Sequence, residues 1–396
     1  MRTIQQVNFK NKKALIRVDF NVPLDQSFNV TDDTRIRAAK PTILKVLKDG
    51  GSCILMSHLG RPKDKEPEFS LKHIVSKLKQ IIGVDVKFSE TCIGEKATNI
   101  AMDLIPGEVL LLENLRYYKE ETQGDEGFAR ALASHGDFYI NDAFGTAHRA
   151  HASTTVVAKF FLNAKCFGFL LAKEIESLEK VMKNGKKPVL AILGGAKVSS
   201  KITIIENILD KIDHLIIGGG MSFTFIKANG GFIGNSIFEP DKLQLALKIL
   251  KMAAKKNVKV HLPVDVLAAD TFDNSSNTQV VDIYNIPSGW QGLDCGPKSR
   301  SVFHGVVQQC RTILWNGPMG VFEFEKFSSG TVAIGESIIE ATQKGAFSLV
   351  GGGDSVAAVK KFKFDRKVSY VSTGGGAMLE SLEGKALPGI AAILNN

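Results

Sequence analysis

Short, apolar, β-rich runs alternate with longer segments of helical periodicity along most of this sequence, and this alternation restricts the possible folds more than any other feature. The runs of the first half are ALIRVDF at 14–20, SCILMSH at 52–58, EVLLLEN at 108–114 and FYINDAF at 138–144. The second half continues with PVLAILGG, HLIIGGG, VKVHLPVDV, TILWNGP, FSLVGGG and VSYVSTGGG. Strands that alternate with helices form parallel sheets, because each parallel strand is reached through a crossover connection. We therefore predict an α/β fold with parallel sheets in Rossmann-like, three-layer domains.

The chain is too long for one ordinary hydrophobic core. Because it has 396 residues, of which 44% are hydrophobic, we expect two domains. The segment FLLAKEIESLEKVMKN has apolar residues at helical spacing and is followed by Gly185 and Pro188. We predict an N-terminal domain at 1–168, a long interdomain helix with a hinge at 169–185, and a second α/β domain at 186–378.

The net charge favours an anionic partner. The chain has 50 Lys and Arg against 41 Asp and Glu, and the resulting +9 suits nucleic acid, an anionic membrane or phosphorylated metabolites. The lysines are scattered through helical stretches without an arginine-rich tail or an aromatic platform, which argues against nucleic acid.

No apolar run reaches the length of a membrane span, and the five cysteines without a C-x-x-C pair are typical of reduced thiols. We expect a cytoplasmic protein that binds neither nucleic acid nor membrane.

Polar and basic side chains follow the predicted strands of the first half. Arginine can bind phosphate or carboxylate oxygens through two parallel hydrogen bonds, and Asp and Asn can hold hydroxyl groups, so the set suits a small phosphorylated hydroxy acid. Singly, each residue has a structural alternative: Asp19 could form an ion pair with Arg17, and Arg61 could only shape a turn. His148 and His151 lack the glutamate of H-E-x-x-H, so no metal is predicted there. The candidates are Asp19, Asn21, Arg35, His58, Arg61, Arg116 and Arg149.

Small residues gather where the strands of the second half end. After the run VLAILGG, Lys197 and Lys201 stand one helical turn apart, and small residues let backbone amides approach an anion. The clusters GGA, GGGM, GPMG, GGGD and TGGGA follow successive strands, although each alone could merely relieve helix–strand packing. Neither G-x-x-x-x-G-K-[ST] nor G-x-G-x-x-G is complete, which argues against a Walker A loop and against an NAD-dependent dehydrogenase. The pattern indicates a phosphate-binding face of another kind.

Two further positions have two interpretations each. Asp354 follows three glycines at a predicted helix start, where its carboxylate could cap the helix or bind a nucleotide-associated Mg²⁺. Gly374, Gly375 and Gly376 precede AMLESL, where their amides could face a transferring phosphoryl group or only form a tight turn. The residues alone leave these alternatives open.

A set of longer motifs follows one order along the chain. The motifs are VDFNVP, TDDTR, SHLGRP, LENLR, NDAFGTAHRAH, GGAKV, GLDCGP, WNGPMGVFE, GGGDS and STGGGA. In order and spacing they resemble the phosphoglycerate kinase family over nearly the whole chain. Ser200 stands where that family often has aspartate, and His73 where it often has proline, but neither position carries the chemistry.

The resemblance implies a phosphotransferase that moves a phosphoryl group reversibly from 1,3-bisphosphoglycerate to ADP, with Mg²⁺, giving 3-phosphoglycerate and ATP. It implies that 1–168 binds the phosphoglycerate, that 186–378 binds ADP or ATP, and that 379–396 packs back on the first domain. It further implies a monomer whose active site lies in an interdomain cleft that closes by hinge bending. Positioning and charge stabilisation would then catalyse the transfer without a general base.

The resemblance also carries roles onto matching positions. Arg35, Lys197, Gly374 and Gly375 would stabilise the transferring phosphoryl group, and Asp354 would bind Mg²⁺. The phosphoglycerate would be held by Asp19, Asn21, Arg35, His58, Leu59, Gly60, Arg61, Arg116 and Arg149. The nucleotide would be held by Gly195, Ala196, Lys201, Gly218, Gly219, Gly292, Leu293, Asn316, Pro318, Glu323, Gly352, Gly353, Asp354 and Ser355.

Overall fold

The computed structural model describes residues 3–395, and the chain folds as two units. Unit 1 comprises Met1–Ile175 and Ala386–Asn396, and unit 2 comprises Glu176–Lys385. Helix α6 (Phe169–Met182) begins in unit 1 and ends in unit 2. Each unit is built on a six-stranded, all-parallel sheet, which confirms the predicted α/β class. Within residues 3–395, no helix has both the length and the apolar character needed to span a membrane.

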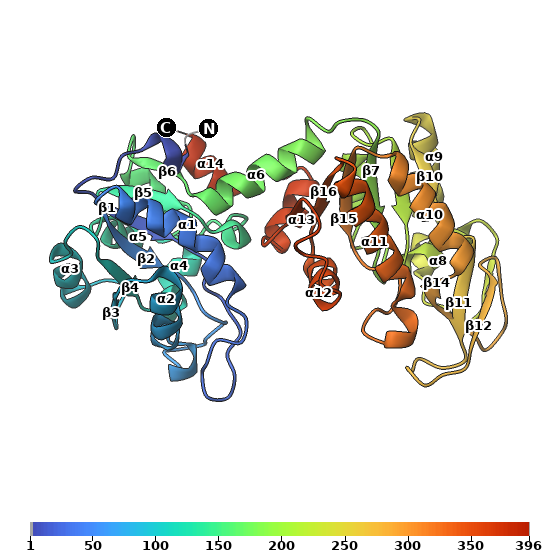
Figure 1. Cartoon of the computed structure of the whole chain (residues 1–396), viewed down its shortest axis with the longest axis horizontal. Coiled ribbons are helices and arrows are strands. Elements are labelled where there is room, and N and C mark those ends of the chain that lie inside the picture. Colours follow the sequence, from blue (N-terminus) through green and yellow to red (C-terminus); the bar gives the residue numbers. More distant parts are fainter. Residues whose placement is uncertain (1–2, 396) are drawn as a thin grey trace. The chain divides into compact units, whose positions relative to one another are not determined.

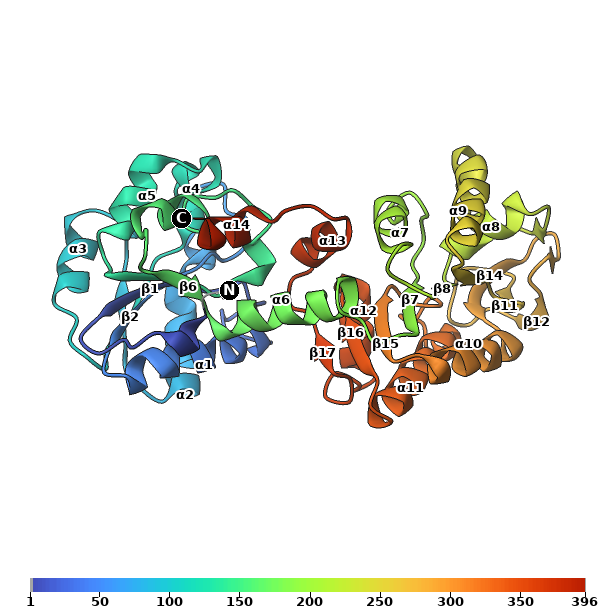
Figure 2. The same ribbon diagram turned by 90° about the horizontal axis from the view of Figure 1, so that it is seen from above.

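The sheet of unit 1 has the strand order β3-β4-β2-β1-β5-β6. Strands β2 (Ser52–Met56) and β4 (Val109–Leu112) are buried along their whole length, as is usual where helices cover both faces of a parallel sheet. Figure 2 shows α1 (Thr34–Lys48) and α2 (Val75–Ile82) on one side of this sheet and α5 (Glu126–Ala133) on the other. The other elements are β1 (Lys13–Arg17), β3 (Val86–Ser89), β5 (Phe138–Asn141), β6 (Lys165–Phe167), α3 (Glu95–Met102), α4 (Lys119–Gln123), η1 (Ile4–Gln6), η2 (Pro67–Phe69), η3 (Leu71–Ile74), η4 (Leu115–Tyr117), η5 (Phe144–Thr146) and η6 (Val156–Phe160).

The last helix, α14 (Pro388–Leu394), belongs to unit 1 although it follows all of unit 2 in the sequence. In Figure 1 this red helix lies beside the blue and green elements of unit 1. The backbone N–H of Gly389 donates to Ala147 O at 2.8 Å, and Asn141 Nδ2 donates to Gly389 O at 3.1 Å. A Cβ at Gly389 would lie 3.1 Å from Ala147 Cα, so α14 packs closely against the segment that follows β5.

The main sheet of unit 2 has the strand order β10-β8-β7-β15-β16-β17. Figure 2 shows α9 (Leu243–Lys255) on one side of this sheet and α10 (Pro297–Gln309) and α11 (Ser329–Gln343) on the other. The other elements are β7 (Val189–Leu193), β8 (His214–Ile217), β9 (Phe232–Ile233), β12 (Thr278–Asp282), β13 (Asn285–Ile286), β14 (Gln291–Cys295), β15 (Thr312–Asn316), β16 (Phe347–Val350), β17 (Tyr370–Val371), α7 (Ile202–Ile208), α8 (Met221–Ala228), α12 (Gly353–Lys361), α13 (Gly376–Leu382), η7 (Pro240–Lys242) and η8 (Glu325–Phe327).

The interpretation of VKVHLPVDV as one strand of the parallel sheet is wrong. The structure divides this run into β10 (Lys259–His261), at the edge of the main sheet, and β11 (Asp265–Ala269), in the centre of an antiparallel sheet of order β12-β11-β14. Pro263 stands between the two strands, where its fixed φ and missing N–H interrupt the pairing. The alternation of apolar residues did not reveal this change of sheet.

The exposed glycine in the middle of α10 lowers the stability of that helix. A Cβ added at Gly305 would meet no atom within 4 Å. Alanine at a helix interior loses less backbone entropy on folding than glycine, so Gly305→Ala is expected to raise the free energy of unfolding by about 0.5–1 kcal/mol. Chemical denaturation of the two proteins checks this. A Gly305→Ala variant less stable than the parent would contradict the prediction that a methyl group fits at this position without strain.

Two histidines on neighbouring strands of unit 2 make its stability depend on pH. His214 Nδ1 and His261 Nε2 are 3.0 Å apart, with the rings stacked at 5.3 Å. Burial lowers the pKa of both residues, that of His261 to about 4, and Lys259 lowers them further while Asp213 opposes the shift at His214. Both folded-state pKa values lie below those of the unfolded chain, so this contribution to stability is complete above about pH 6.5 and is lost as the pH falls.

We therefore expect the free energy of unfolding to fall as the pH is lowered from about 7 toward 4.5, and the slope to be smaller in His261→Asn. Urea denaturation at several pH values measures the slope. The exposed His304, on α10, supplies the matched control His304→Asn. An unchanged slope in His261→Asn would contradict the prediction.

Candidate active site

The parallel strands of unit 1 carry the basic candidates at their carboxyl ends. β1 ends at Arg17, two residues before Asp19, and β2 ends two residues before His58. The segments after β4 and β5 contain Arg116 and Arg149. Because β4, β2, β1 and β5 are neighbours in the sheet, these segments meet at one edge, where ligands bind in open α/β sheets.

Arg35 is held by the loop that follows β1. Its Nη1 lies 3.1 Å from Asp19 Oδ1, in an ion pair, and donates to Asn21 O at 3.0 Å. Asn21 Oδ1 in turn accepts a hydrogen bond from Gly60 N at 2.8 Å. The Arg35 side chain is 36% exposed, so it is fixed in place and still accessible to a ligand. The ion-pair partner of Asp19 is thus Arg35, and not Arg17 as the structural alternative required.

Asn114 and Arg116 fix the loop that follows β2. Asn114 Nδ2 donates to Leu59 O at 2.7 Å, and Asn114 Oδ1 accepts from Leu59 N at 3.2 Å. Arg116 Nη1 donates to Gly60 O. Burial lowers the pKa of Arg116 below its usual value, and neighbouring arginines act in the same direction. Asn114 lies inside the LENLR motif but is not among the residues predicted from the sequence.

Cationic groups crowd this edge of unit 1. Burial and nearby arginine charges lower the pKa of His151 to about 4 and that of His58 well below its usual value. These groups therefore share one positive local potential, which attracts an anion. The arginines responsible are Arg17, Arg35, Arg116 and Arg149, and Arg61 acts on Arg116.

Glycines let three strand ends of unit 2 meet backbone to backbone. Gly195 N donates to Pro318 O, and Gly219 N donates to Met319 O, both at 3.2 Å. A Cβ on Gly194 would lie 2.1 Å from Pro318 O, and one on Gly219 would lie 2.7 Å from Gly195 N. Neither position has room for a side chain. Close approach of these backbones explains Gly194 and Gly219, whereas Gly195 needs glycine for its φ of +108°.

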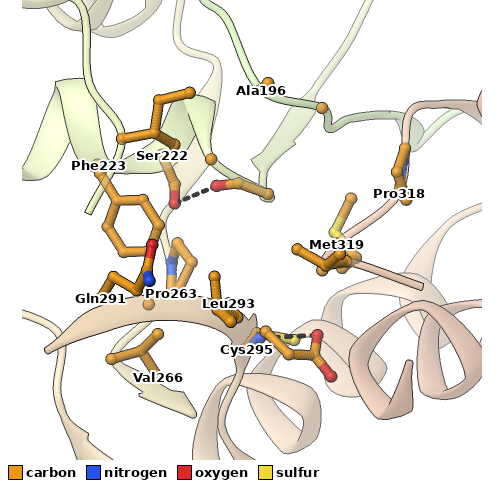
Figure 3. A pocket seen from close by; sticks show the side chains of 18 of the residues that line it. Ala196, Ser222, Phe223, Pro263, Val266, Gln291, Leu293, Cys295, Pro318 and Met319 are labelled. Atoms are coloured by element: carbon orange, nitrogen blue, oxygen red, sulfur yellow. Dashed lines mark hydrogen bonds between the residues drawn. The ribbon is translucent and has the colours of Figure 1, made fainter. Parts of the chain in front are cut away.

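A pocket of about 390 Å³ lies against this junction. Figure 3 shows the apolar side chains of Phe223, Leu293 and Met319 around it. An apolar pocket of this kind suits a flat aromatic ring such as a nucleobase. Gly218 lies behind Met319, since a Cβ there would be 2.3 Å from the Met319 sulfur. The nucleotide candidates that line the pocket are Gly195, Ala196, Gly219, Gly292, Leu293, Pro318, Glu323 and Asp354.

Further candidates gather around Asn316, the last residue of β15. Lys201 Nζ donates to Asn316 Oδ1. Gly352 has a φ of +93°, and a Cβ there would lie 2.4 Å from Asn316 Nδ2, so glycine is required. Ser355 Oγ accepts from Gly317 N at 2.5 Å. The structure thus brings a lysine, an amide and the start of α12 together.

Asp354 lies beside Gly353 in the first turn of α12 and lines the pocket. Burial lowers the pKa of Lys201, while the charge of Asp354 raises it, so the two side chains are within electrostatic reach. A single carboxylate near a lysine fits Mg²⁺, which proteins commonly hold through one or two carboxylates together with substrate phosphates.

The prediction that Lys197 and Lys201 stand one helical turn apart is wrong. Helix α7 begins at Ile202, and the residues before it form a turn, so the two lysines do not share a helix face. Lys197 is exposed on this turn. Ser199 N donates to Glu239 Oε2 at 2.9 Å, and Ser199 Oγ donates to Glu239 Oε1 at 2.5 Å. These two hydrogen bonds fix the position of the turn.

Gly374 and Gly375 lie immediately before α13. Gly375 is the N-cap residue, with a φ of +43°, and Gly374 N donates to Ser372 Oγ at 3.1 Å. A positive φ favours glycine, so the tight turn explains Gly375 without a ligand. The amides at this helix start nevertheless remain the kind of group that binds an anion.

Comparison with known proteins identifies the family. The sequence model described as "Phosphoglycerate kinase" matches residues 4–385. The chain belongs to the phosphoglycerate kinase family. It is 55% identical to the phosphoglycerate kinase of Porphyromonas gingivalis over 99% of each chain, and 52% identical to a cytosolic phosphoglycerate kinase of Triticum aestivum over 99% of this chain and 97% of that protein. The structure of phosphoglycerate kinase from Coxiella burnetii matches with a TM-score of 0.91 and 40% identity, over 99% of this chain and 98% of the other.

Phosphoglycerate kinase activity, a step of glycolysis, is therefore the activity of this chain. The family identity accounts for the long motifs, which were predicted to belong together. Several buried polar residues of unit 1 lie outside the candidate site residues. They include Asn114, Arg17, Glu121 and Ser153.

Proposed function

We propose that the enzyme binds the phosphoglycerate on the basic edge of unit 1 and the Mg²⁺ nucleotide in the pocket of unit 2, and that it transfers the phosphoryl group reversibly from 1,3-bisphosphoglycerate to ADP. The observation that carries this proposal is the pocket of unit 2, because Asp354 lines its apolar slot and lies within electrostatic reach of Lys201. The apolar part of such a site would bind the base of a nucleotide, and its charged residues would bind the phosphates with Mg²⁺. The wheat relative is cytosolic by name, and we propose the cytoplasm for this enzyme as well.

On unit 1, arginines would hold the phosphate and carboxylate oxygens of the phosphoglycerate, and Asp19 and Asn21 would hold its hydroxyl group. Arg35 would stabilise the charge of the transferring phosphoryl group, since its guanidinium is fixed by Asp19 and stays accessible. The further residues proposed for this site are His58, Leu59, Gly60, Arg61, Arg116 and Arg149.

On unit 2, Lys201 and Asn316 would contact the nucleotide phosphates. Lys197, on the exposed turn before α7, would stay in contact with the phosphoryl group during the transfer. The Gly375 amide would supply a further donor to the anion, and the Gly374 amide would do so in place of its hydrogen bond to Ser372 Oγ. Asp354 would hold Mg²⁺, which neutralises phosphate charge when it is bound. An acyl phosphate is a reactive donor and a nucleotide phosphate oxygen is a good nucleophile, so no side chain need remove a proton.

Equilibrium titration of Asp354→Asn tests the metal and nucleotide assignment. We expect the affinity for ADP with Mg²⁺ to fall about tenfold, because the loss of a charged ligand costs roughly 1.5 kcal/mol, whereas ADP without Mg²⁺ should bind at least as well as in the parent. The affinity for 3-phosphoglycerate should not change. Equal losses with and without Mg²⁺ would contradict the role of Asp354.

A further inference from the structure

An arginine is buried at the centre of the unit 1 sheet, beneath the basic edge. Arg17 is the last residue of β1 and is only 1% exposed. Each nitrogen of its guanidinium makes a hydrogen bond: Nε donates to Ser153 Oγ at 2.8 Å, and Nη1 donates to Val18 O. The third nitrogen, Nη2, lies 3.2 Å from His58 Nδ1. A buried charge that is bonded in this way has one fixed orientation.

The other end of this network is a buried carboxylate. Glu121, on α4, is 1% exposed and accepts from Ser153 Oγ at 2.6 Å and from Ser153 N at 2.9 Å. Burial raises the pKa of Glu121, while the charge of Arg17 and the hydrogen bonds of Ser153 lower it. Glu121 therefore offsets the charge of Arg17 through Ser153. Double hydrogen bonding from one serine sets the distance between the two charges.

The contact with Arg17 decides where His58 carries its proton. A guanidinium has donors and no acceptor, so His58 Nδ1 must accept, and the proton of the neutral ring must be on Nε2. His58 is 4% exposed, and its burial lowers the pKa well below the usual value. The charged and titratable groups that act on it are Arg17, Arg116, Arg35 and His151, and all of them oppose protonation.

We propose that Arg17, held by Ser153 and Glu121, is a positioning residue that keeps His58 as the neutral Nε2–H tautomer and fixes the direction of this hydrogen-bond donor. The inference rests on the proposed function, in which His58 contacts the phosphoglycerate. The neutral Nε2–H of His58 adds no charge to an edge that already carries several arginines. The ring also needs no additional proton before it can donate to the phosphoglycerate. Binding through His58 is then independent of pH across the physiological range.

Nitrogen NMR of the full-length enzyme with ¹⁵N-labelled histidine tests the tautomer without any substrate. The spectrum of His58→Gln identifies the two signals of His58. In the parent we expect one protonated nitrogen, Nε2, and one unprotonated nitrogen, Nδ1, with no change between about pH 5 and 8. A protonated Nδ1 in the parent would overturn the proposal, whatever the activity.

Two variants then connect the tautomer with binding. Arg17→Met should mix the two tautomers of His58 or let the ring titrate, and Arg17→Lys should restore the Nε2–H form in part, because lysine keeps a donor. Ser153→Ala leaves Arg17 in place with one hydrogen bond fewer, and it covers the case that Arg17→Met does not fold. In both Arg17→Met and Ser153→Ala we expect the KM for 3-phosphoglycerate to rise about tenfold, with the KM for ATP unchanged.

The matched control is Arg130→Met, because Arg130 lies on α5 with its side chain 69% exposed. It should change neither the His58 signals nor the KM. An altered tautomer with an unchanged KM for 3-phosphoglycerate would overturn the positioning role. If the parent binds 3-phosphoglycerate without shifting the His58 signals, the proposed substrate site is wrong instead, so the two failures are distinguishable.

Discussion

Arg35→Ala is expected to lower kcat by roughly 10²- to 10³-fold, the loss typical of removing one charge-stabilising donor. The affinity for ADP with Mg²⁺ should stay unchanged, because Arg35 lies in unit 1 and contacts Asp19 and Asn21 there. The variant also leaves the Asp19 carboxylate without its cation, close to where an anionic substrate would bind. Steady-state kinetics together with ADP titration measure both effects.

Arg37→Ala is the matched control, because Arg37 lies on the same helix and forms an exposed ion pair with Asp33 at 2.8 Å. This variant should keep the parental kcat. If Arg35→Ala lost nucleotide affinity as much as turnover, the assignment of Arg35 to the phosphoglycerate side would be contradicted.

Gly194→Ala is expected to weaken ADP binding by about 10- to 100-fold, since overpacking a tight site costs about 1–3 kcal/mol. The new Cβ would lie 2.1 Å from Pro318 O and 2.7 Å from Gly317 O. Both atoms belong to the backbone, so no side-chain rotation relieves the contact. The ends of β7 and β15 must separate, which displaces Gly195 and Pro318 in the pocket wall.

The affinity for 3-phosphoglycerate should be unaffected in Gly194→Ala, because the strain is confined to unit 2. Gly305→Ala, in open space on the same unit, is the control and should bind ADP as the parent does. Calorimetric titration with each ligand measures these affinities. Unchanged ADP binding by Gly194→Ala would mean that the strand junction does not shape the pocket.

The parallel sheets and the position of most candidates at strand ends could be predicted, because apolar runs mark buried strands and parallel strands bring their carboxyl ends to one edge. The pairing of Asp19 with Arg35 could not, since local spacing favoured Arg17 as strongly. The network of Arg17, Ser153 and Glu121 joins segments far apart in the sequence, and no local pattern encodes it.

Other features depend on tertiary packing as well. The break at Pro263 moves β11 into a separate antiparallel sheet, although the run VKVHLPVDV is apolar on both sides of the proline. The apolar wall of the pocket comes from Phe223 on α8, Leu293 on β14 and Met319 in the loop after β15. Phe223 and Met319 look like ordinary core residues in the sequence, and Leu293 was predicted only through the family resemblance.

The most direct test of the proposed phosphoryl transfer is a coupled assay of 3-phosphoglycerate phosphorylation by the purified enzyme and by its Lys197→Ala variant. We expect the parent to consume 3-phosphoglycerate only when ATP and Mg²⁺ are both present. Lys197→Ala should bind both substrates and lose turnover, because Lys197 is proposed to act on the transferring group. A parent that binds ADP without turnover, or a Lys197→Ala variant with full activity, would contradict the account.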